Sequence, residues 1–187
     1  MRYIPIIFFI FLFSFTVISC AKKSDSSSSS SANGSPGTYQ LATNDYANGV
    51  ATDSSGNVYV TGGTKGGLDG NTSAGNTDLF MLKYNSSGTK QWTKQLGSSG
   101  RDSANAIAID SSGNLYVTGM TFGGLDWNTN AGANDLFVVK YNSSGTKEWT
   151  EQLGSASSDF ANGVATDSSG NVYVAGVTYG GLDGNSN

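Results

Sequence analysis

The chain repeats itself with a period of 57 residues, and this repetition constrains its fold more than any other feature. The segment DSSGN-(V/L)-YV-(T/A)-G begins at residues 53, 110 and 167, and YNSSGTK-x-WT-x-QLG begins at 84 and 141. Residues 47–103 and 104–160, aligned without gaps, are identical at 39 of 57 positions, and 161–187 starts a third unit. Such repetition predicts one structural unit that stacks on copies of itself to bury a continuous core.

Each unit predicts four short β-strands and no helix. In the first unit we expect strands over residues 49–52, 57–64, 79–84 and 91–96. Apolar and polar side chains alternate along 57–64, which is typical of a half-buried strand. The connecting DSSG and NSSG segments predict tight turns, in which Asp or Asn bonds the turn and Gly supplies a positive φ. Four strands in a repeated unit are typical of a β-propeller blade, so the sequence predicts an all-β fold of four-stranded antiparallel blades.

The motif YVTG-x-T, followed by DLF-x-x-KYN-x-x-G-x-x-x-W, resembles the SBBP β-propeller repeat of bacterial proteins. The resemblance covers residues 47–187 and extends less well to 38–46. It implies a β-propeller fold and a secreted or surface location, and it implies no particular reaction. Propellers usually close with about 4–8 blades, so about two and a half units predict an open or incomplete propeller. The chain is then a fragment, or it assembles with copies of itself or with partners.

Composition excludes several kinds of site. The chain contains no His and one Cys, which excludes Ser-His-Asp and Cys-His catalysis, an imidazole metal site and an intramolecular disulfide. Ten basic residues against fourteen acidic ones argue against nucleic-acid binding. No nucleotide-binding loop or nucleophile elbow occurs in a suitable context. We therefore expect a non-enzymatic protein with no catalytic residue and no cofactor.

The N-terminus predicts a lipoprotein signal peptide over residues 1–19. Arg2 precedes an apolar run over 4–18, which is shorter than the roughly 20 residues that a membrane span needs. The sequence Val-Ile-Ser-Cys at 17–20 resembles the lipobox of bacterial lipoproteins, although Leu is more usual than Val17. The resemblance implies cleavage before Cys20 and acylation of its thiol. An ordinary signal peptide and an uncleaved anchor are the alternatives.

A Ser-rich tether is expected over residues 20–37, where six consecutive Ser occupy 26–31. This segment has little to bury and predicts a flexible link with a root-mean-square span of roughly 20–25 Å. The repeat region then occupies 38–187, with units at 47–103, 104–160 and 161–187. Together the lipobox and the tether predict a protein held by lipid on a bacterial envelope membrane, at the outer membrane or the cell surface.

The loop between the second and third strands of each unit carries oxygen side chains at alternate positions. Such side chains suit Ca²⁺, but the pattern lacks the glycine and closing glutamate of an EF-hand. Turn formation by Asp and Asn is the alternative. The calcium candidates are Asp69, Asn71, Asp126, Asn128, Asn130, Asp183 and Asn185.

Two positions in this loop differ between units and predict a ligand-binding surface. One slot holds Lys65, Phe122 and Tyr179 in successive units. The other slot holds Trp127 in the second unit and Gly in the first and third. Exposed aromatic side chains at these positions would stack on sugar rings or pack on a protein partner. Neutral drift at unconstrained surface positions is the alternative.

These observations predict a lipid-anchored envelope protein that acts as a non-catalytic binding module for an unknown protein or carbohydrate ligand. A fragment of a larger propeller enzyme, of the hydrolase or quinoprotein type, is the alternative, with its catalytic residues outside this chain. A truncated product without a stable fold is a third hypothesis.

Overall fold

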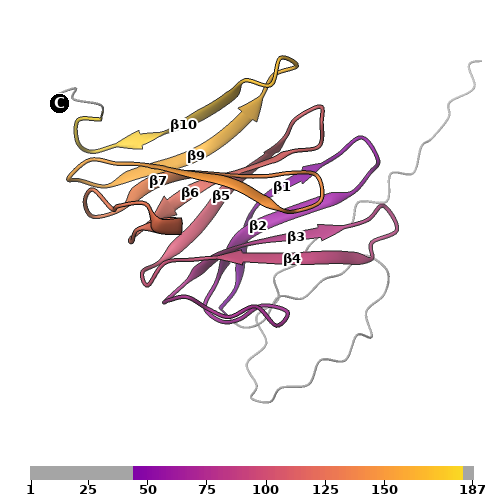
Figure 1. Cartoon of the computed structure of the whole chain (residues 1–187), viewed down its shortest axis with the longest axis horizontal. Coiled ribbons are helices and arrows are strands. Elements are labelled where there is room, and N and C mark those ends of the chain that lie inside the picture. The colour runs from indigo at the N-terminus through magenta and orange to yellow at the C-terminus, as the bar shows by residue number, and fades with distance from the viewer. Residues whose placement is uncertain (1–43, 183–187) are drawn as a thin grey trace, which may run out of the picture. The chain divides into compact units, whose positions relative to one another are not determined.

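The computed structural model describes residues 44–182, and these form antiparallel β-sheets stacked in chain order (Figure 1). The first sheet contains β1 (Tyr46–Thr52), β2 (Val58–Thr64), β3 (Asp78–Tyr84) and β4 (Lys90–Leu96). The second contains β5 (Asp102–Ile109), β6 (Leu115–Thr121), β7 (Asp135–Tyr141) and β8 (Lys147–Leu153). β9 (Asp159–Thr166) and β10 (Val172–Thr178) form a two-stranded sheet, and one 3-10 turn, η1, spans Leu125–Trp127. The predicted all-β class with four-stranded units is confirmed.

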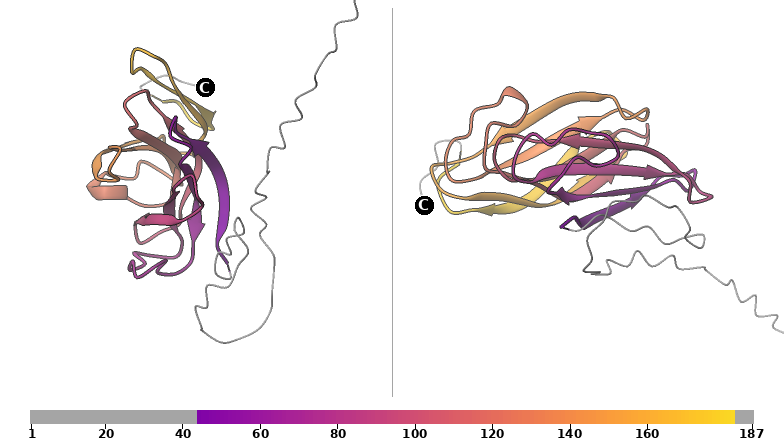
Figure 2. Two further views of the ribbon diagram at one scale, coloured as in Figure 1. Left: turned by 90° about the vertical axis from the view of Figure 1, so that its right-hand side faces the viewer. Right: turned by 90° about the horizontal axis from the view of Figure 1, so that it is seen from below.

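The strands of each sheet follow one another as an up-and-down meander. The strand orders are β1-β2-β3-β4 and β5-β6-β7-β8, and each neighbour is antiparallel. The two sheets share one register, with Tyr59 opposite Lys83 and Tyr116 opposite Lys140. Figure 2 shows the sheets stacked face to face, with β9 and β10 at one end of the stack. The sheets do not close into a ring, as expected for an open or incomplete propeller.

The first strand of each unit starts earlier than the sequence predicts. β1 begins at Tyr46 rather than at residue 49, because a β-bulge lies between Ala47 and Gly49. The bulged residue, Asn48, has no cross-strand partner and instead donates its side-chain amide to the carbonyl of Ala104 on β5, at 2.9 Å. Asn105 makes the same bond to Ala161 on β9, also at 2.9 Å. Bulges therefore re-aim one side chain per unit to tie each sheet to the next.

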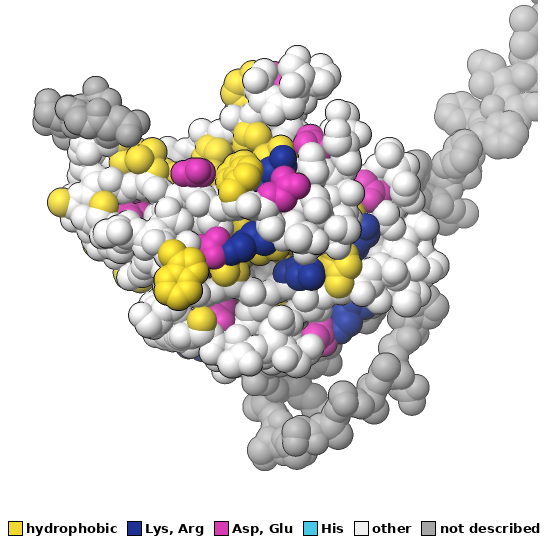
Figure 3. All heavy atoms as spheres, in the orientation of Figure 1, with side chains coloured by type: hydrophobic (Ala, Val, Ile, Leu, Met, Phe, Trp, Pro, Cys, Tyr) yellow, Lys and Arg dark blue, Asp and Glu magenta, His cyan; other side chains and the backbone are white. Residues whose placement is uncertain are grey.

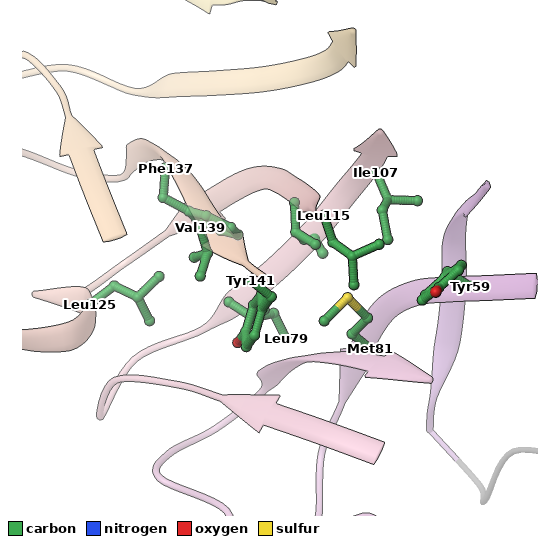
Figure 4. Packing of buried hydrophobic residues seen from close by; sticks show 11 residues of the cluster. Tyr59, Leu79, Met81, Ile107, Leu115, Leu125, Phe137, Val139 and Tyr141 are labelled. Atoms are coloured by element: carbon green, nitrogen blue, oxygen red, sulfur yellow. The ribbon is translucent and has the colours of Figure 1, made fainter. Parts of the chain in front are cut away.

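The apolar core lies between the first and second sheets (Figure 4). Leu79 and Met81 from β3 meet Leu115 from β6 and Phe137 and Val139 from β7. These side chains belong to strands that are far apart in sequence, and each is almost completely buried. Repeat-to-repeat changes among them exchange aliphatic residues of similar size, which a packed core tolerates best.

The DSSG turns have the chemistry expected from their sequence. One carboxylate oxygen of Asp110 accepts hydrogen bonds from the backbone N–H groups of Ser112 and Asn114, at 2.9 Å each. The other accepts from the Asn114 side chain at 2.8 Å and from the Tyr116 hydroxyl at 3.3 Å. Gly113 supplies the positive φ, at 80°. The turn therefore depends on all the acceptor sites of a carboxylate.

We predict that Asp110→Asn lowers the free energy of unfolding by about 1 kcal/mol near neutral pH. Asparagine keeps one acceptor oxygen for the backbone, but its amide nitrogen cannot accept from Asn114 or Tyr116. Urea unfolding followed by circular dichroism measures the change. The matched control is Asn142→Ala in the NSSG turn, where the side-chain oxygen also accepts backbone N–H groups, from Ser144 and Thr146. A loss below the error of the Asp110→Asn measurement would show that the second oxygen contributes nothing.

The same carboxylate predicts a pH dependence. Burial by itself would raise the pKa of Asp110, but the hydrogen bonds from Asn114, Ser112 and Tyr116 outweigh it and lower that pKa. A carboxyl whose pKa falls on folding contributes stability above its unfolded pKa, about 3.9, and loses it as the pH falls through the folded pKa. Wild type should therefore lose more stability than Asp110→Asn between about pH 5 and pH 2.

Candidate functional site

The loop between β6 and β7 presents Trp127 almost completely to solvent, with 99% of the residue exposed. Its two neighbours in η1 behave differently. Leu125 is fully buried in the core cluster, and Asp126 is partly buried. The loop is thus held by Leu125 and turned so that the indole points away from the protein.

The backbone of this loop is left-handed at two successive residues that are not glycine. Asp126 has a φ of 54° and Trp127 a φ of 71°. The first unit has the same geometry, with φ of 51° at Asp69 and 82° at Gly70. A left-handed conformation costs a residue with a Cβ roughly 1–2 kcal/mol, and glycine avoids that cost. Trp127 therefore occupies a glycine position without a packing contact that would explain it.

Contacts with β8 hold the loop in this conformation. The backbone N–H of Leu125 donates to the Gln152 side chain at 2.9 Å. Asn128 donates its side-chain amide to the carbonyl of Leu125 at 2.9 Å. Asp126 forms an ion pair with Lys147. Burial by itself would raise the pKa of Asp126, but the hydrogen bond from Lys147 helps to lower it, so the carboxyl is ionised near neutral pH.

The other predicted ligand-surface residues are exposed, and each belongs to a different unit. Lys65, Phe122 and Tyr179 directly follow β2, β6 and β10, at the same end of their sheets. Tyr179 packs edge-on against Phe160, with ring centroids 6.3 Å apart. Phe122 shares its loop with Trp127. On the face drawn in Figure 3, hydrophobic side chains emerge in small groups among charged ones.

The calcium candidates within residues 44–182 are already engaged by groups of the protein itself. Asp69 pairs with Lys90 at 2.6 Å, and Asn71 donates to the carbonyl of Leu68 at 2.7 Å. Asn130 accepts from the backbone N–H of Gly132 at 2.9 Å. Asp183 and Asn185 lie outside the described residues. Within 44–182, no three acidic or sulfur side chains gather into a metal-binding group, so calcium binding stays a prediction without geometric support.

Fully buried carboxylates occur where one sheet leads into the next. The backbone N–H of Asp102 donates to the carbonyl of Thr77, at 2.7 Å, which places Asp78 and Asp102 at neighbouring strand starts. Asp78 accepts from Gln95 at 2.7 Å, and Asp102 accepts from the backbone of Ser98 at 2.6 Å. Both residues have no exposed surface. Burial and repulsion from Asp78 raise the pKa of Asp102. Because these carboxylates are enclosed, we assign them to the junction rather than to chemistry on a substrate.

The left-handed backbone at 126–127 and the bulged asparagines were not predicted from the sequence. A signal for the first was present, since Gly70 and Gly184 occupy the equivalent slot in the other units. Glycine in two of three copies indicates a backbone position that requires positive φ. A bulge leaves no comparable mark, because Asn48 and Asn105 fit an ordinary strand pattern equally well.

We predict that Trp127→Gly raises the free energy of unfolding by about 0.5–1 kcal/mol. Relief of the left-handed strain stabilises the folded chain by roughly 1–2 kcal/mol, and the extra freedom of glycine in the unfolded chain offsets roughly 0.4–1 kcal/mol. Urea unfolding measures the sum. The reciprocal variant, Gly70→Trp, should lose stability by a similar amount, because a Cβ there meets open space and only φ opposes it. Unchanged stability in both variants would contradict the strain argument.

No helix within residues 44–182 is long and apolar enough to span a bilayer. The apolar run over 4–18, the lipobox ending at Cys20 and the tether over 20–37 lie outside the described residues. The hypothesis of lipid anchoring therefore depends on the sequence alone.

Two curated proteins are similar to this chain. The regulatory protein FlaEY of Caulobacter vibrioides is 30% identical over 147 residues, which cover 71% of this chain and 15% of that protein. An uncharacterized WD repeat-containing protein, L264, of Acanthamoeba polyphaga mimivirus is 28% identical over 133 residues, or 62% of this chain and 9% of that protein. The chain thus spans a small part of the length of these relatives.

The family model for the β-propeller repeat named SBBP matches residues 40–69, 91–126 and 148–183. The second match begins in β4, crosses the sheet junction and continues through β5 and β6 to the loop of η1. The third match follows the same path from β8 through β9 and β10. The resemblance to the SBBP repeat is confirmed: the chain belongs to the SBBP β-propeller-repeat family.

Proposed function

We propose that this protein is a lipid-anchored, non-catalytic binding module of the bacterial envelope, with Trp127 as its main contact residue. The observation that carries the proposal is the geometry of Trp127, which is 99% exposed and left-handed where the first unit has glycine. A strained backbone at an exposed residue lowers the stability of the folded chain, and no packing contact offsets that loss. The tryptophan at this position therefore points to a role in binding. The absence of His and the enclosure of the junction carboxylates support a function without catalysis.

Carbohydrate is the ligand class that the surroundings of Trp127 favour. An indole offers a flat apolar face, and the Asp126–Lys147 ion pair beside it supplies charged groups that can bond to hydroxyls. A sugar ring has an apolar face bordered by hydroxyl groups, which matches an aromatic platform with polar groups at its rim. A bacterial envelope supplies such a polymer as peptidoglycan.

Co-sedimentation of the full chain with purified peptidoglycan tests the ligand. Wild type should pellet with the polymer, and Trp127→Gly should pellet at least about tenfold less while being more stable than wild type. Val50→Ala is the matched control, because Val50 is an exposed apolar residue on a different strand. Equal sedimentation of wild type and Trp127→Gly would contradict a contact role for this residue.

Metabolic labelling with radioactive palmitate tests the anchor in bacterial cells that express the chain. Label should enter the wild-type protein and should be absent from Cys20→Ala, which removes the only thiol. More than one acyl chain gives stable membrane attachment, whereas a single chain is marginal. Unlabelled wild-type protein in the soluble fraction would contradict anchoring and would leave the peptidoglycan test unaffected.

Part of a larger propeller enzyme is the second candidate: the chain spans only 15% and 9% of the length of its two relatives, although neither is named as an enzyme. Sequencing of the DNA beyond codon 187 distinguishes the candidates. Further repeat-coding sequence with His or clustered acidic residues would favour the enzyme, and a stop codon in the genomic copy would oppose it.

A further inference from the structure

The β3–β4 hairpin and the β7–β8 hairpin have nearly the same sequence but opposite charge. Residues 84–97 and 141–154 are identical except at two positions. The first hairpin has Gln91 where the second has Glu148, and Lys94 where the second has Glu151. The first difference adds one positive charge to the first hairpin relative to the second, and the other adds two. Both changes therefore make the first hairpin more basic at the same place in the repeat.

Lys94 joins a second lysine, Lys83, on the face of the first sheet that is turned toward the second sheet. In the register of β3 with β4, Lys83 stands opposite Trp92, and Lys94 stands opposite Met81, two residues before Lys83. Such diagonal positions lie roughly 7–8 Å apart, which long side chains can bridge. Met81 belongs to the core cluster between the sheets, and Trp92 packs against it. The two lysines, called the lysine pair below, thus share the rim of that core.

Two stacked aromatic rings support the lysine pair. The Lys83 ammonium lies 5.1 Å from the centroid of Tyr59, and the Lys94 ammonium lies 6.0 Å from the centroid of Trp92. The two rings are themselves 5.9 Å apart. Both lysines are half-buried, so their stems lie along apolar surface while their charged ends remain accessible. An anion that meets two charges in such partly desolvated surroundings is attracted more strongly than in open water.

Neither ammonium of the lysine pair forms an ion pair within residues 44–182. The ion pairs there join Lys90 to Asp69, Lys140 to Glu148 and Lys147 to Asp126. Lys140 is the counterpart of Lys83 in the second sheet, and Glu148 neutralises it at 2.9 Å. In the first sheet the corresponding residue is Gln91, which carries no charge. The repulsion between Lys83 and Lys94 is therefore uncompensated, and an anion bound to both would relieve it.

The turn between β7 and β8 fixes the position of Lys94. A Cβ on Gly145, in that turn, would lie 3.2 Å from Cε of Lys94 and 3.0 Å from the Trp92 ring. The backbone of the second sheet therefore lies directly on these two side chains, and glycine is the residue that fits. On the face drawn in Figure 3, Lys and Arg side chains gather near the centre, with hydrophobic ones beside them. The lysine pair is thus placed by contacts between the first two sheets.

We propose that Lys83 and Lys94 bind a phosphate group. A phosphate monoester carries a charge of nearly −2 above neutral pH, which matches two ammonium groups, whereas a carboxylate carries a single charge. Lysine binds phosphate as a point charge, without the planar fork by which arginine recognises carboxylates. A phosphorylated sugar and a lipid headgroup both present this chemistry. The site is separate from the contact proposed for Trp127, and either can fail without the other.

The test titrates the ¹⁵N-labelled full chain, in a neutral detergent, with inorganic phosphate at constant ionic strength. Amide shifts should move on β3, on β4 and in the β7–β8 turn. Lys94→Glu should weaken binding about tenfold or more. This variant should fold, because the second hairpin has Glu151 at the same position. Lys83→Met should weaken binding by a similar factor, and the matched control Lys140→Met, in the second sheet, should bind within about twofold of wild type.

Thermal unfolding separates binding from a general effect of salt on stability. Without phosphate, Lys94→Glu should unfold at a higher temperature than wild type, because the repulsion with Lys83 is gone. Added phosphate should then raise the unfolding temperature of wild type more than that of the variant, since it stabilises only a chain that binds it. Equal shifts with chloride and phosphate, or binding that Lys94→Glu leaves unchanged, would overturn the proposal.

Two soluble phosphate esters distinguish the sources of the phosphate group. Glucose 6-phosphate represents a phosphorylated sugar, and glycerol 3-phosphate represents a lipid headgroup. Tighter binding of the first than of inorganic phosphate would support the site and assign it to a sugar ligand, and tighter binding of the second would support it and assign it to a headgroup. If neither ester bound more tightly than inorganic phosphate, the lysine pair would hold an adventitious ion only, and the proposal would be wrong.

Discussion

Phe137→Ala is expected to lower the free energy of unfolding by about 3–5 kcal/mol. Phe137 has no exposed surface and belongs to the core cluster between the first two sheets. It stands opposite Gly119 on β6, so its ring fills the space that the glycine leaves above that strand. Removal of the ring opens a cavity between two sheets that the backbone bonds of each sheet prevent from closing.

Urea unfolding followed by tryptophan fluorescence measures this loss. Phe122→Ala is the matched control, because it removes the same ring from an exposed position in the same unit and should change stability by less than about 0.5 kcal/mol. A loss below about 2 kcal/mol in Phe137→Ala would mean that the second sheet packs less tightly on the first than the structure shows.

Gly119→Ala is expected to cost about 3 kcal/mol, although alanine adds only one methyl group. A Cβ at this position would collide with the carbonyl oxygen of Ser103 and with the Cα of Ala104, and both atoms belong to the backbone of β5. The close approach follows from the bulge between Ala104 and Ala106, which brings β5 over the glycine. Since backbone cannot rotate aside as a side chain does, relief requires loss of the bulge or of strand pairing.

Gly163→Ala is the matched control in the neighbouring sheet. A Cβ there meets nothing within 4 Å, and the equivalent residue of the second unit is already alanine, Ala106. This variant should be neutral or more stable by up to about 1 kcal/mol, because alanine restricts the unfolded chain. Comparable losses in Gly119→Ala and Gly163→Ala would show that strand propensity, rather than the bulge, sets the requirement for glycine.

Much of the architecture was predictable because it depends on local sequence. The strands near 57–64, 79–84 and 91–96 follow from alternation and from the turn residues between them, and the structure places each within one residue of the predicted bounds. The DSSG turn around Asp110 is also local, since all its hydrogen-bond partners lie within six residues. Patterns of this kind need no knowledge of distant segments.

The candidate site was predictable only in part. The difference at the slot of Trp127 was visible in the sequence, and the structure places this residue on the surface. Its left-handed backbone was not predicted, although glycine at the equivalent position of the other two units indicated it. The contacts that hold the loop, with Gln152 and Lys147, could not be predicted, because these residues lie more than twenty positions further along the chain. The same limit applied to Asn105, whose role appears only when β9 lies beside it.

The repeated tyrosines show most clearly what the local sequence determines and what the tertiary structure decides. By itself, the sequence determined that Tyr59, Tyr116 and Tyr173 sit on equivalent strands and bond equivalent aspartates, because those contacts lie within one turn. Only the tertiary structure decided that the first two are buried and the third is more than half exposed. Identical local sequences have the same local bonds, but burial depends on which surfaces lie against them, and the stack of sheets provides different neighbours for each copy.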